Sequence, residues 1–500
     1  MRKPDRRLLV AALALAPLAL ALGGCNLAPT YKLPPVPVAS SYQGTADQSS
    51  GPWQQAQPSD QLPRDHWWQL YHDARLDQLE QQLLASNADL AAALAHYQQA
   101  QAFARQARSE LFPQIGASAN GQRDHQSDTK PLRGPLTGPG ASPANYNSFT
   151  VGAEVDYEFD LWGRVRNTVE AGKDTAQAAA ADLASAQLSL QAQLADDYMQ
   201  LRGLDQQIDL LRQSTDAFQK ALQLTENLHQ GGIVSGLDVA RAQTQLSNAK
   251  SLWSQTLAQR ALVQDAIAVL VGASASQFSL APDTTPIELP QVPASVPSVL
   301  LQRRPDIAAA ERRTAAANAQ IGIARAAYFP SLGLNMQGGY QSAAYPGLFN
   351  APNQFWAIGP TLFETLFDGG YRKAQVRAAR AATDEAGARY RSVVLNAFAQ
   401  VEDNLAQIDH LGVARGDQRD AANAAQHSLD MAMVQYKAGA VSYLDVTQSQ
   451  TAALDAKISL LSLDTQQLRA SVQLIRALGG GWSSDQLASR SATVPAGSIR

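Results

Sequence analysis

The chain has 500 residues, of which 45% are hydrophobic and 17% are charged, and its formal net charge at pH 7 is −4. This mildly acidic balance supplies no basic patch, which argues against a nucleic-acid partner. The single cysteine excludes an internal disulfide, so stability must come from packing or oligomerisation.

Residues 1–24 have the pattern of a lipoprotein signal peptide. A basic head precedes an apolar run, Leu8 to Leu22, that is too short to span a bilayer comfortably. The run ends at Cys25 in a Leu-Gly-Gly-Cys sequence that resembles the bacterial lipobox, which implies a covalent lipid (diacylglycerol and N-acyl groups, such as palmitate) on Cys25 and no other cofactor. Asn26 then indicates the outer membrane by the sorting rule of such lipoproteins. The alternative is an ordinary signal with an incidental thiol.

Residues 25–65, rich in Pro, Ser and Gln, are typical of an extended tether. Beyond them the chain is duplicated. Pro113 recurs in phase as Pro330, and Asp238 recurs as Asp445, each within a matching local sequence. A duplication of this length predicts two equivalent halves rather than a stack of small units. We assign repeat 1 to residues 66–290, repeat 2 to residues 291–482, and a tail to residues 483–500.

Repeat 1 begins with a helical pattern from Leu76 to Leu111. The period then changes to two, which predicts strands at about 113–124 and 148–160, separated by an irregular, proline-rich loop. In the second strand every odd residue from Phe149 to Leu161 is apolar and every even one is polar or glycine. One face of this strand should therefore be apolar.

Long helical arms follow over residues 166–272. Apolar residues recur at alternating steps of three and four, and glycines at 231 and 232 break the pattern before it resumes, so the arm should double back as an antiparallel coiled coil. Repeat 2 predicts a helix starting near Pro305, strands at about 330–342 and 354–367, and arms over 372–479. The pattern of the fourth strand does not assign its faces.

Strands of this length suit a tilted membrane strand of ~9–11 residues, although a soluble sheet with one buried face would show the same alternation. The lipobox and the long loop favour the membrane. An open sheet edge would leave backbone groups unpaired in lipid. Since known single-chain barrels have at least ~8 strands, four strands must join those of other copies, eight in a dimer or twelve in a trimer.

The sequence shows no catalytic or metal-binding constellation. The seven histidines are scattered, and neither a phosphate-binding glycine loop nor a nucleophile elbow is present. We therefore expect no enzyme activity and no metal site. At the arm tips, Ser235 with Asp238 and Ser442 with Asp445 follow glycine breaks and predict capping boxes. In an oligomer these aspartates could also form rings of like charge around a pore.

Five motifs together resemble the TolC-like outer-membrane factors, and most closely their lipoprotein branch, similar to OprM and NodT. The motifs are Trp67-Trp68-x-x-Tyr71-x-Asp73, Asn87-x-Asp89-Leu90, Arg303-Arg304-Pro305-Asp306-Ile307, Phe367-Asp368-Gly369-Gly370, and Tyr436-Lys437-Ala438-Gly439 followed by Ser442-x-Leu444-Asp445-Val446.

The resemblance implies an α+β membrane protein: a homotrimer whose twelve-stranded β-barrel continues into a periplasmic α-barrel. The protein would be a passive outer-membrane conduit of a tripartite efflux system, lipid-anchored and extending into the periplasm. It would work with a periplasmic adaptor (a membrane fusion protein) and an inner-membrane pump of the RND type, and export drugs or other toxic compounds. The alternatives are type I protein secretion and a structural surface lipoprotein.

The resemblance also places a gate at the arm tips. Asp238 and Tyr436 match positions that hold the family's closed end together, whereas Val441 stands where an arginine of that lock falls. The ionic link is therefore absent, and we expect a constriction formed by aspartate rings and apolar side chains. The candidate gate residues are Asp238, Tyr436, Val441, Tyr443 and Asp445.

Overall fold

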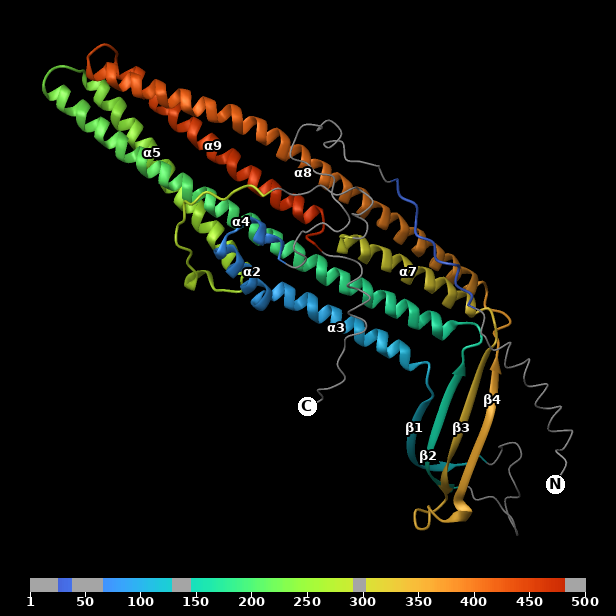
Figure 1. Ribbon diagram of the computed structural model, residues 1–500. Helices are drawn as coiled ribbons and strands as arrows, with labels where there is room; N and C mark the ends of the chain where they lie inside the picture. The colour runs from blue at the N-terminus through green and yellow to red at the C-terminus, as the bar shows by residue number, and fades with distance from the viewer. Residues whose placement is uncertain (1–25, 38–65, 128–144, 291–302, 482–500) are drawn as a thin grey trace, which may run out of the picture. The chain divides into compact units, whose positions relative to one another are not determined.

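A computed structural model describes residues 26–37, 66–127, 145–290 and 303–481 (Figure 1). Among these residues a helix, two strands and a helical hairpin occur twice, and in the first copy a further helix precedes them. The first series is α2 (Ala74–Ser86), α3 (Ala88–Ser109), β1 (Gln114–His125), β2 (Asn145–Phe159), α4 (Arg164–Gln230) and α5 (Gly236–Leu270). The second is α7 (Pro305–Ala326), β3 (Ser331–Ser342), β4 (Gln354–Phe363), α8 (Tyr371–Lys437) and α9 (Tyr443–Ala477). Short 3-10 helices are η2 (Trp67–Tyr71), η3 (Ala275–Gln277) and η4 (Ala351–Asn353).

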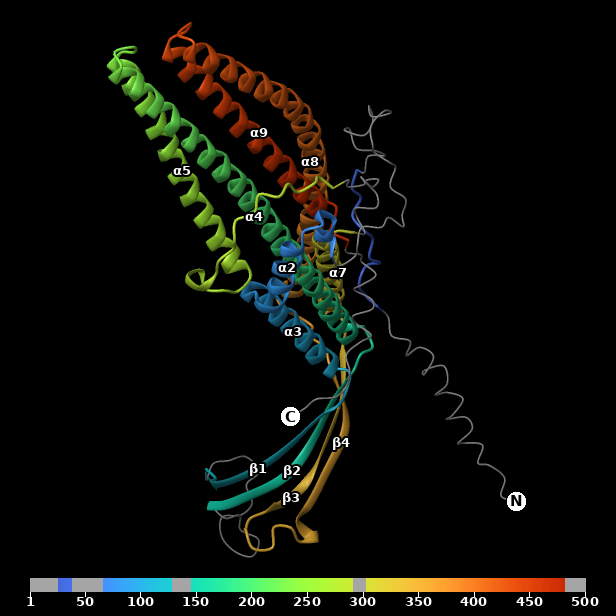
Figure 2. The same ribbon diagram turned by 60° about the vertical axis from the view of Figure 1, so that its left-hand side comes forward.

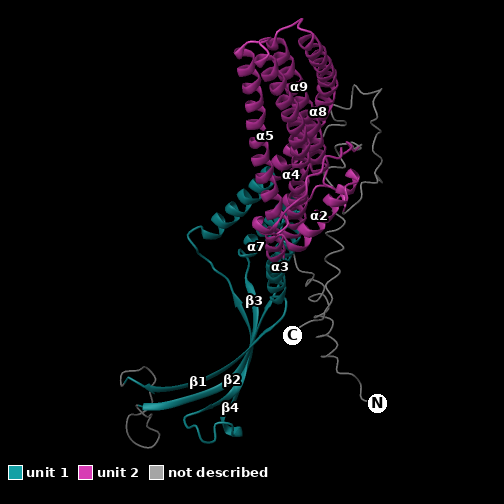
Figure 3. Ribbon diagram, turned by 90° about the vertical axis from the view of Figure 1, so that its left-hand side faces the viewer, with its two compact units in different colours: residues 1–34, 98–178, 311–389 teal, residues 35–97, 179–310, 390–500 magenta. Residues whose placement is uncertain are grey.

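The chain divides into two compact units, and each contains parts of both repeats (Figure 3). Unit 1 contains the four strands and the helix segments nearest to them in sequence. Unit 2 contains the two helical hairpins and the start of each repeat. Unit 1 comprises residues 1–34, 98–178 and 311–389, and unit 2 comprises residues 35–97, 179–310 and 390–500.

The sheet of unit 1 has the order β1-β2-β3-β4 and is antiparallel throughout (Figure 2). Val151 of β2 lies opposite Ala119 on one side and Tyr340 on the other. Because directly opposed residues project to the same face, the odd residues of β2 share one apolar face with apolar residues of its neighbours.

The register also assigns the faces of β4. Ile358 lies opposite Met336, so the even residues of β4 belong to the apolar face. Trp356, Ile358 and Leu362 are 75%, 57% and 69% exposed in the single chain. Large apolar side chains so exposed on one sheet face require an apolar environment outside the chain.

The fourth strand ends at Phe363 and not near residue 367 as the sequence predicted. Phe363 pairs with Ser331, the first residue of β3, so later residues have no partner strand. The chain turns instead to begin α8, where the Asp368 carboxylate accepts hydrogen bonds from the backbone N–H groups of Gly370 (2.9 Å) and Arg372 (3.2 Å). Asp368 therefore caps the helix rather than extending the sheet.

The predicted continuous helix from Leu76 to Leu111 was wrong, because it breaks at Asn87 between α2 and α3. The Asn87 side chain accepts the backbone N–H of Leu90 (2.8 Å) and donates to the carbonyl of Leu270 (2.8 Å). It thus caps α3 while tying the break to the end of α5. Pro305 and Asp306 begin α7, which confirms that prediction.

The largest core lies in unit 2. Trp67, Trp68 and Tyr71 of η2 are almost fully buried and pack in one cluster with apolar residues of α2, α4, α8 and α9. A second cluster lies along the two hairpins and includes Leu246, Tyr436 and Tyr443. These clusters explain the motif around Trp67 as a packing motif, since its aromatic residues fill the core between helices of both repeats.

None of the helices in the described ranges combines the length and the apolar character needed to cross a membrane.

Candidate functional site at the hairpin tips

The first hairpin tip joins α4 to α5 through a glycine turn. Gly232 has a φ of +75°, a backbone conformation that residues with a side chain rarely adopt. The N–H of Ile233 donates to the carbonyl of Leu228 (2.9 Å) and closes the end of α4. After this turn, the N–H and the hydroxyl of Ser235 both donate to Oδ2 of Asp238, at 3.4 and 3.1 Å. The predicted capping box therefore forms at the start of α5.

The second tip, between α8 and α9, repeats this geometry. Gly439 also has φ +75, and the N–H of Ala440 donates to the carbonyl of Gln435 (2.9 Å). The N–H and the hydroxyl of Ser442 donate to Oδ2 of Asp445, at 3.1 and 2.8 Å. Both tips thus hold an aspartate in the first turn of the returning helix, where the helix dipole favours a negative charge.

The two aspartates differ in their charge partners. Nη1 of Arg241 lies 3.5 Å from Oδ1 of Asp238, whose side chain is only 18% exposed. In repeat 2 the residue that follows Asp445 by three positions, as Arg241 follows Asp238, is the uncharged Gln448. The side chain of Asp445 is exposed. The carboxylate of Asp445 is therefore the more effective one for acting on an ion in solution.

Behind the capping boxes, two tyrosines fill the space between the hairpins. Tyr436 and Tyr443 are 6% and 2% exposed, and their rings meet edge to face with centroids 5.2 Å apart. Burial raises the pKa of Tyr443 to about 12, with a smaller raising effect from Tyr436, while a side-chain hydrogen bond with Thr225 of α4 opposes the shift. Val441 is partly buried against the same cluster.

The structure thus brings the five candidate gate residues to the two tips of unit 2, where the tyrosines join the hairpins and the aspartates lie in the first turns of α5 and α9. Arg241 and Thr225 also contact these residues and were not predicted from the sequence. Arg241 follows Asp238 by three residues on one helix, a spacing that predicts contact. Thr225 had no such signal, because its contact with Tyr443 joins segments far apart in sequence.

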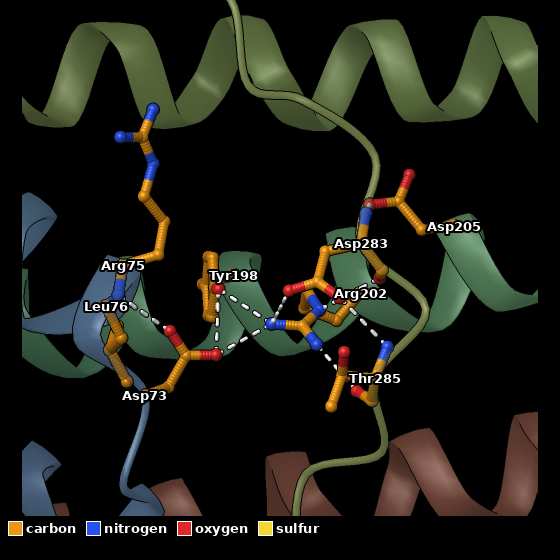
Figure 4. Close-up of polar contacts among 8 residues, drawn as sticks. All are labelled: Asp73, Arg75, Leu76, Tyr198, Arg202, Asp205, Asp283 and Thr285. Atoms are coloured by element: carbon orange, nitrogen blue, oxygen red, sulfur yellow. Dashed lines mark hydrogen bonds and ion pairs between the residues drawn. The ribbon is translucent and has the colours of Figure 1, made fainter.

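A second polar centre in unit 2 surrounds Arg202 of α4 (Figure 4). Asp73 caps α2 through the N–H groups of Arg75 (2.8 Å) and Leu76 (3.1 Å). Its other oxygen accepts from the hydroxyl of Tyr198 (2.9 Å) and from Nη1 of Arg202 (2.7 Å).

Arg202 also binds the segment that follows α5. It donates to the backbone carbonyls of Asp283 (3.0 Å) and Thr285 (2.6 Å) and lies 3.2 Å from the Asp283 carboxylate. The guanidinium is thus fully engaged in fastening the segment around Asp283 and the start of α2 to α4. The arrangement is a structural clasp, because its contacts join α2, α4 and the segment after α5.

Two further expectations concern other parts of the chain. Cys25, the predicted lipidation site, lies outside the described residues. Within the described ranges, no group of three or more His, Cys, Asp and Glu side chains could hold a metal ion.

Two stretches of the chain, 79–273 and 296–480, match the outer membrane efflux protein family. The outer membrane protein OprJ of Pseudomonas aeruginosa is 33% identical over 468 residues, which cover 93% of this chain and 95% of OprJ. The toluene efflux pump outer membrane protein TtgC of Pseudomonas putida is 33% identical over 475 residues, which cover 94% of this chain and 95% of TtgC.

Among solved structures, the outer-membrane channel OprN superimposes with a TM-score of 0.82 at 29% identity, over 92% of this chain and 100% of that chain. The two stretches matched by the family fall one in each repeat and together contain the four strands and both hairpins. The chain therefore belongs to the outer membrane efflux protein family, the TolC-like outer-membrane factors, and is the outer-membrane channel component of an efflux system.

Proposed function

We propose that three copies of this chain form one passive conduit through the outer membrane. The observation that carries this proposal is the open sheet, in which β1 and β4 lie at the two ends of the strand order. Their outer edges must be paired in lipid. Three copies joined edge to edge give a closed barrel of twelve strands, whereas one copy has too few to close. The hairpins of the three copies would continue the conduit as a periplasmic α-barrel.

In this assembly the tips form the entrance to the conduit. Three copies of Asp445 would form a ring of uncompensated carboxylates, and three copies of Asp238 a ring balanced in part by Arg241. Behind these rings, Tyr436 and Tyr443 would hold the two hairpins of each copy together through the apolar cluster that they share with α4 and α5. Val441 would add an apolar side chain at the position that the resemblance matches to an arginine of the lock.

The conduit would dock on a periplasmic adaptor and, through it, on an inner-membrane pump of the RND type. Supporting this, the relative TtgC is named as the outer membrane protein of an efflux pump. The chain itself would supply neither energy nor catalysis, so the pump would select the cargo. We infer that the cargo consists of small toxic compounds of low polarity, since that relative serves toluene efflux.

We further propose that the mature chain begins at a lipidated Cys25 and is anchored in the outer membrane by that lipid. The lipobox-like sequence before Cys25 supports this proposal. No described feature favours protein secretion or a purely structural surface role over small-molecule efflux.

Complementation tests the function. A strain that lacks its own outer-membrane channel but keeps its pump and adaptor accumulates toluene-like solvents and dyes. This chain is expressed in that strain together with the pump and adaptor from the chain's own source genome. Accumulation of a fluorescent hydrophobic dye should then fall. A properly inserted chain that leaves accumulation unchanged, while supporting export of a protein substrate, would replace the proposal by type I secretion.

A further inference from the structure

The first described residues of the chain are fastened along the part of α7 that belongs to unit 1, residues 311–326 (Figure 1). Nη1 of Arg325 donates to the backbone carbonyl of Leu27 (3.0 Å), and Nδ2 of Asn318 donates to that of Pro29 (2.8 Å). The hydroxyl of Tyr31 donates to Oε1 of Glu311 (3.0 Å). The sequence predicted an extended tether for residues 25–65, of which residues 26–37 are described. Within this described part, Leu27, Pro29 and Tyr31 are held by side chains of α7.

The α7 residues that hold this segment form a single stripe. Glu311, Asn318, Gly322 and Arg325 recur at steps of seven, four and three, which places them on one face of the helix. Side-chain donors on this stripe suit an extended, proline-containing segment, because prolines offer carbonyl acceptors but no N–H donors. Asn318 and Arg325 therefore bind the backbone of the segment, whereas Tyr31 is held through its side chain.

A close approach lies in the middle of the stripe. A Cβ on Gly322 would lie 2.8 Å from Cβ of Ala28 and 2.7 Å from Nδ2 of Asn167, so the glycine makes room for both. Asn167 of α4 is 4% exposed and donates to the side-chain oxygen of Asn26 (3.0 Å). The same oxygen accepts the N–H of Ala28 (3.0 Å), which fixes the turn at the start of the segment.

The duplicated helix shows that this stripe is not a general property of the repeat. The alignment that pairs Pro113 with Pro330 places Arg105 of α3 opposite Gly322, and Leu94 opposite Glu311. An arginine in place of the glycine would fill the space that Ala28 occupies. Only the second copy of the helix is therefore shaped to receive the N-terminal segment.

We propose that the stripe on α7 is a docking rail that holds the N-terminal segment and sets where the N-terminus meets the membrane. Arg325 lies in the last turn of α7, shortly before β3 begins at Ser331. Leu27 is thus held at the strand end of α7. A lipid attached just before Asn26 is then delivered beside the strands. Only this last step rests on the proposed lipidation, whereas docking itself needs no lipid.

A disulfide reports on docking. Cβ of Pro34 lies 3.9 Å from the position of a Cβ on Gly387, within the range of about 3.5–4.5 Å that disulfides require. Pro34→Cys with Gly387→Cys is placed in two forms of the full mature protein. One carries its own signal, and the other is secreted with an ordinary cleaved signal, begins at Asn26 and has no lipid.

The initial rate of disulfide formation under mild oxidant should be the same in both forms. Gly322→Leu should lower this rate in both forms. Gly416→Leu, at a glycine with nothing within 4 Å of an added Cβ, should not. The paired change Asn318→Ala with Arg325→Ala covers the case in which Gly322→Leu does not fold. It should lower the rate on the order of ten-fold, as expected for two lost hydrogen bonds.

A disulfide that forms only in the lipidated protein would overturn the rail, and so would an unchanged rate in the rail variants. Absence of the lipid itself would be seen in the mass of the native N-terminus. That result would contradict lipid anchoring. The disulfide rates of the variants in the form that begins at Asn26 would still test docking, so a failure of lipidation and a failure of docking are distinguishable.

Discussion

The tip aspartates of the two repeats share one capping geometry but differ in what balances their charge. Ser235 and Ser442 hold Asp238 and Asp445 alike, yet only Asp238 has a cation, Arg241, within ion-pair distance in the described structure. An unbalanced carboxylate acts more strongly on a passing ion than one with a nearby cation, because the opposite charges largely cancel at a distance. Asp445 should therefore contribute more than Asp238 to the selectivity of the conduit.

Asp445→Asn should reduce cation selectivity in single-channel recordings, and Asp238→Asn should change it less. Asparagine keeps a side-chain oxygen, so each change should cost no more than about 1 kcal/mol in capping. Reversal potentials in a salt gradient measure the effect, with thermal unfolding as the control for assembly. Equal effects of the two changes would refute the role assigned to Arg241.

Glu80 of α2 is fully buried, and neither of its side-chain oxygens has a hydrogen-bond partner in the described structure. Burial, with a smaller effect from Asp77, raises the pKa of the Glu80 carboxyl well above its usual range. The folded state then retains a proton that the unfolded state releases. Stability should therefore fall as the pH rises above the ordinary pKa of glutamate and through the raised pKa.

Glu80→Gln should flatten this loss of stability with rising pH, because the amide cannot ionise. Glu80→Met, which also removes the unpaired polar atoms, should add roughly 1–3 kcal/mol at neutral pH. Unfolding midpoints measured across the pH range test both expectations, with Glu288→Gln at an exposed position as the matched control. A wild-type profile that Glu80→Gln leaves unaltered would show that Glu80 does not titrate as inferred.

At the scale of elements, the hairpins are joined at their tips by a tyrosine pair with unequal hydroxyls. Tyr443 shares a hydrogen bond with Thr225, whereas the hydroxyl of Tyr436 is buried with no partner among the described residues. Tyr443→Phe should thus cost about 0.5–1.5 kcal/mol, and Tyr436→Phe should be neutral or slightly stabilising. Denaturant unfolding of the two variants side by side measures the difference. The reverse order would contradict this assignment.

Val151 lies on the apolar face of β2 and Thr150 on the opposite face. Val151→Arg should cost roughly 2–4 kcal/mol per chain if that face meets lipid, whereas Thr150→Arg should be tolerated and change conductance instead. Yields of folded protein in detergent and unfolding measurements compare the two. A tolerated Val151→Arg would mean that this face does not meet lipid.

The sequence alone predicted the elements that local pattern controls. The two-residue period placed β1, β2 and β3 within a few residues, and the glycine breaks placed both hairpin tips. It did not predict the break at Asn87, because that residue is held by the distant carbonyl of Leu270. The faces of β4 required its register with β3.

The candidate site residues could likewise be predicted only where their contacts are local in sequence. The capping boxes could be predicted because Ser235 and Asp238 lie three residues apart. The contact between Tyr443 and Thr225, and the docking of Leu27 on Arg325, join segments far apart in sequence that no local pattern connects. Contacts of this kind become visible only once the helices of the two repeats are packed together.

At the scale of the whole molecule, the four strands form an open sheet that leaves backbone hydrogen-bonding groups unpaired along its two edges. The described sheet ends at β1 and β4, and its apolar face exposes Trp356, Ile358 and Leu362. A lipid environment would cover that face, and further copies of the chain would pair the two edges. Both requirements are met together when the strands of three copies close into one barrel.

The mass of the detergent-solubilised protein, measured by native mass spectrometry, tests this claim most directly. We expect a mass three times that of the mature chain, with single-channel conductance in the same preparation. A folded monomer that conducts ions would contradict it, because four strands would then have closed a pore without partners. An eight-stranded dimer that conducts would contradict the trimer while keeping the shared barrel.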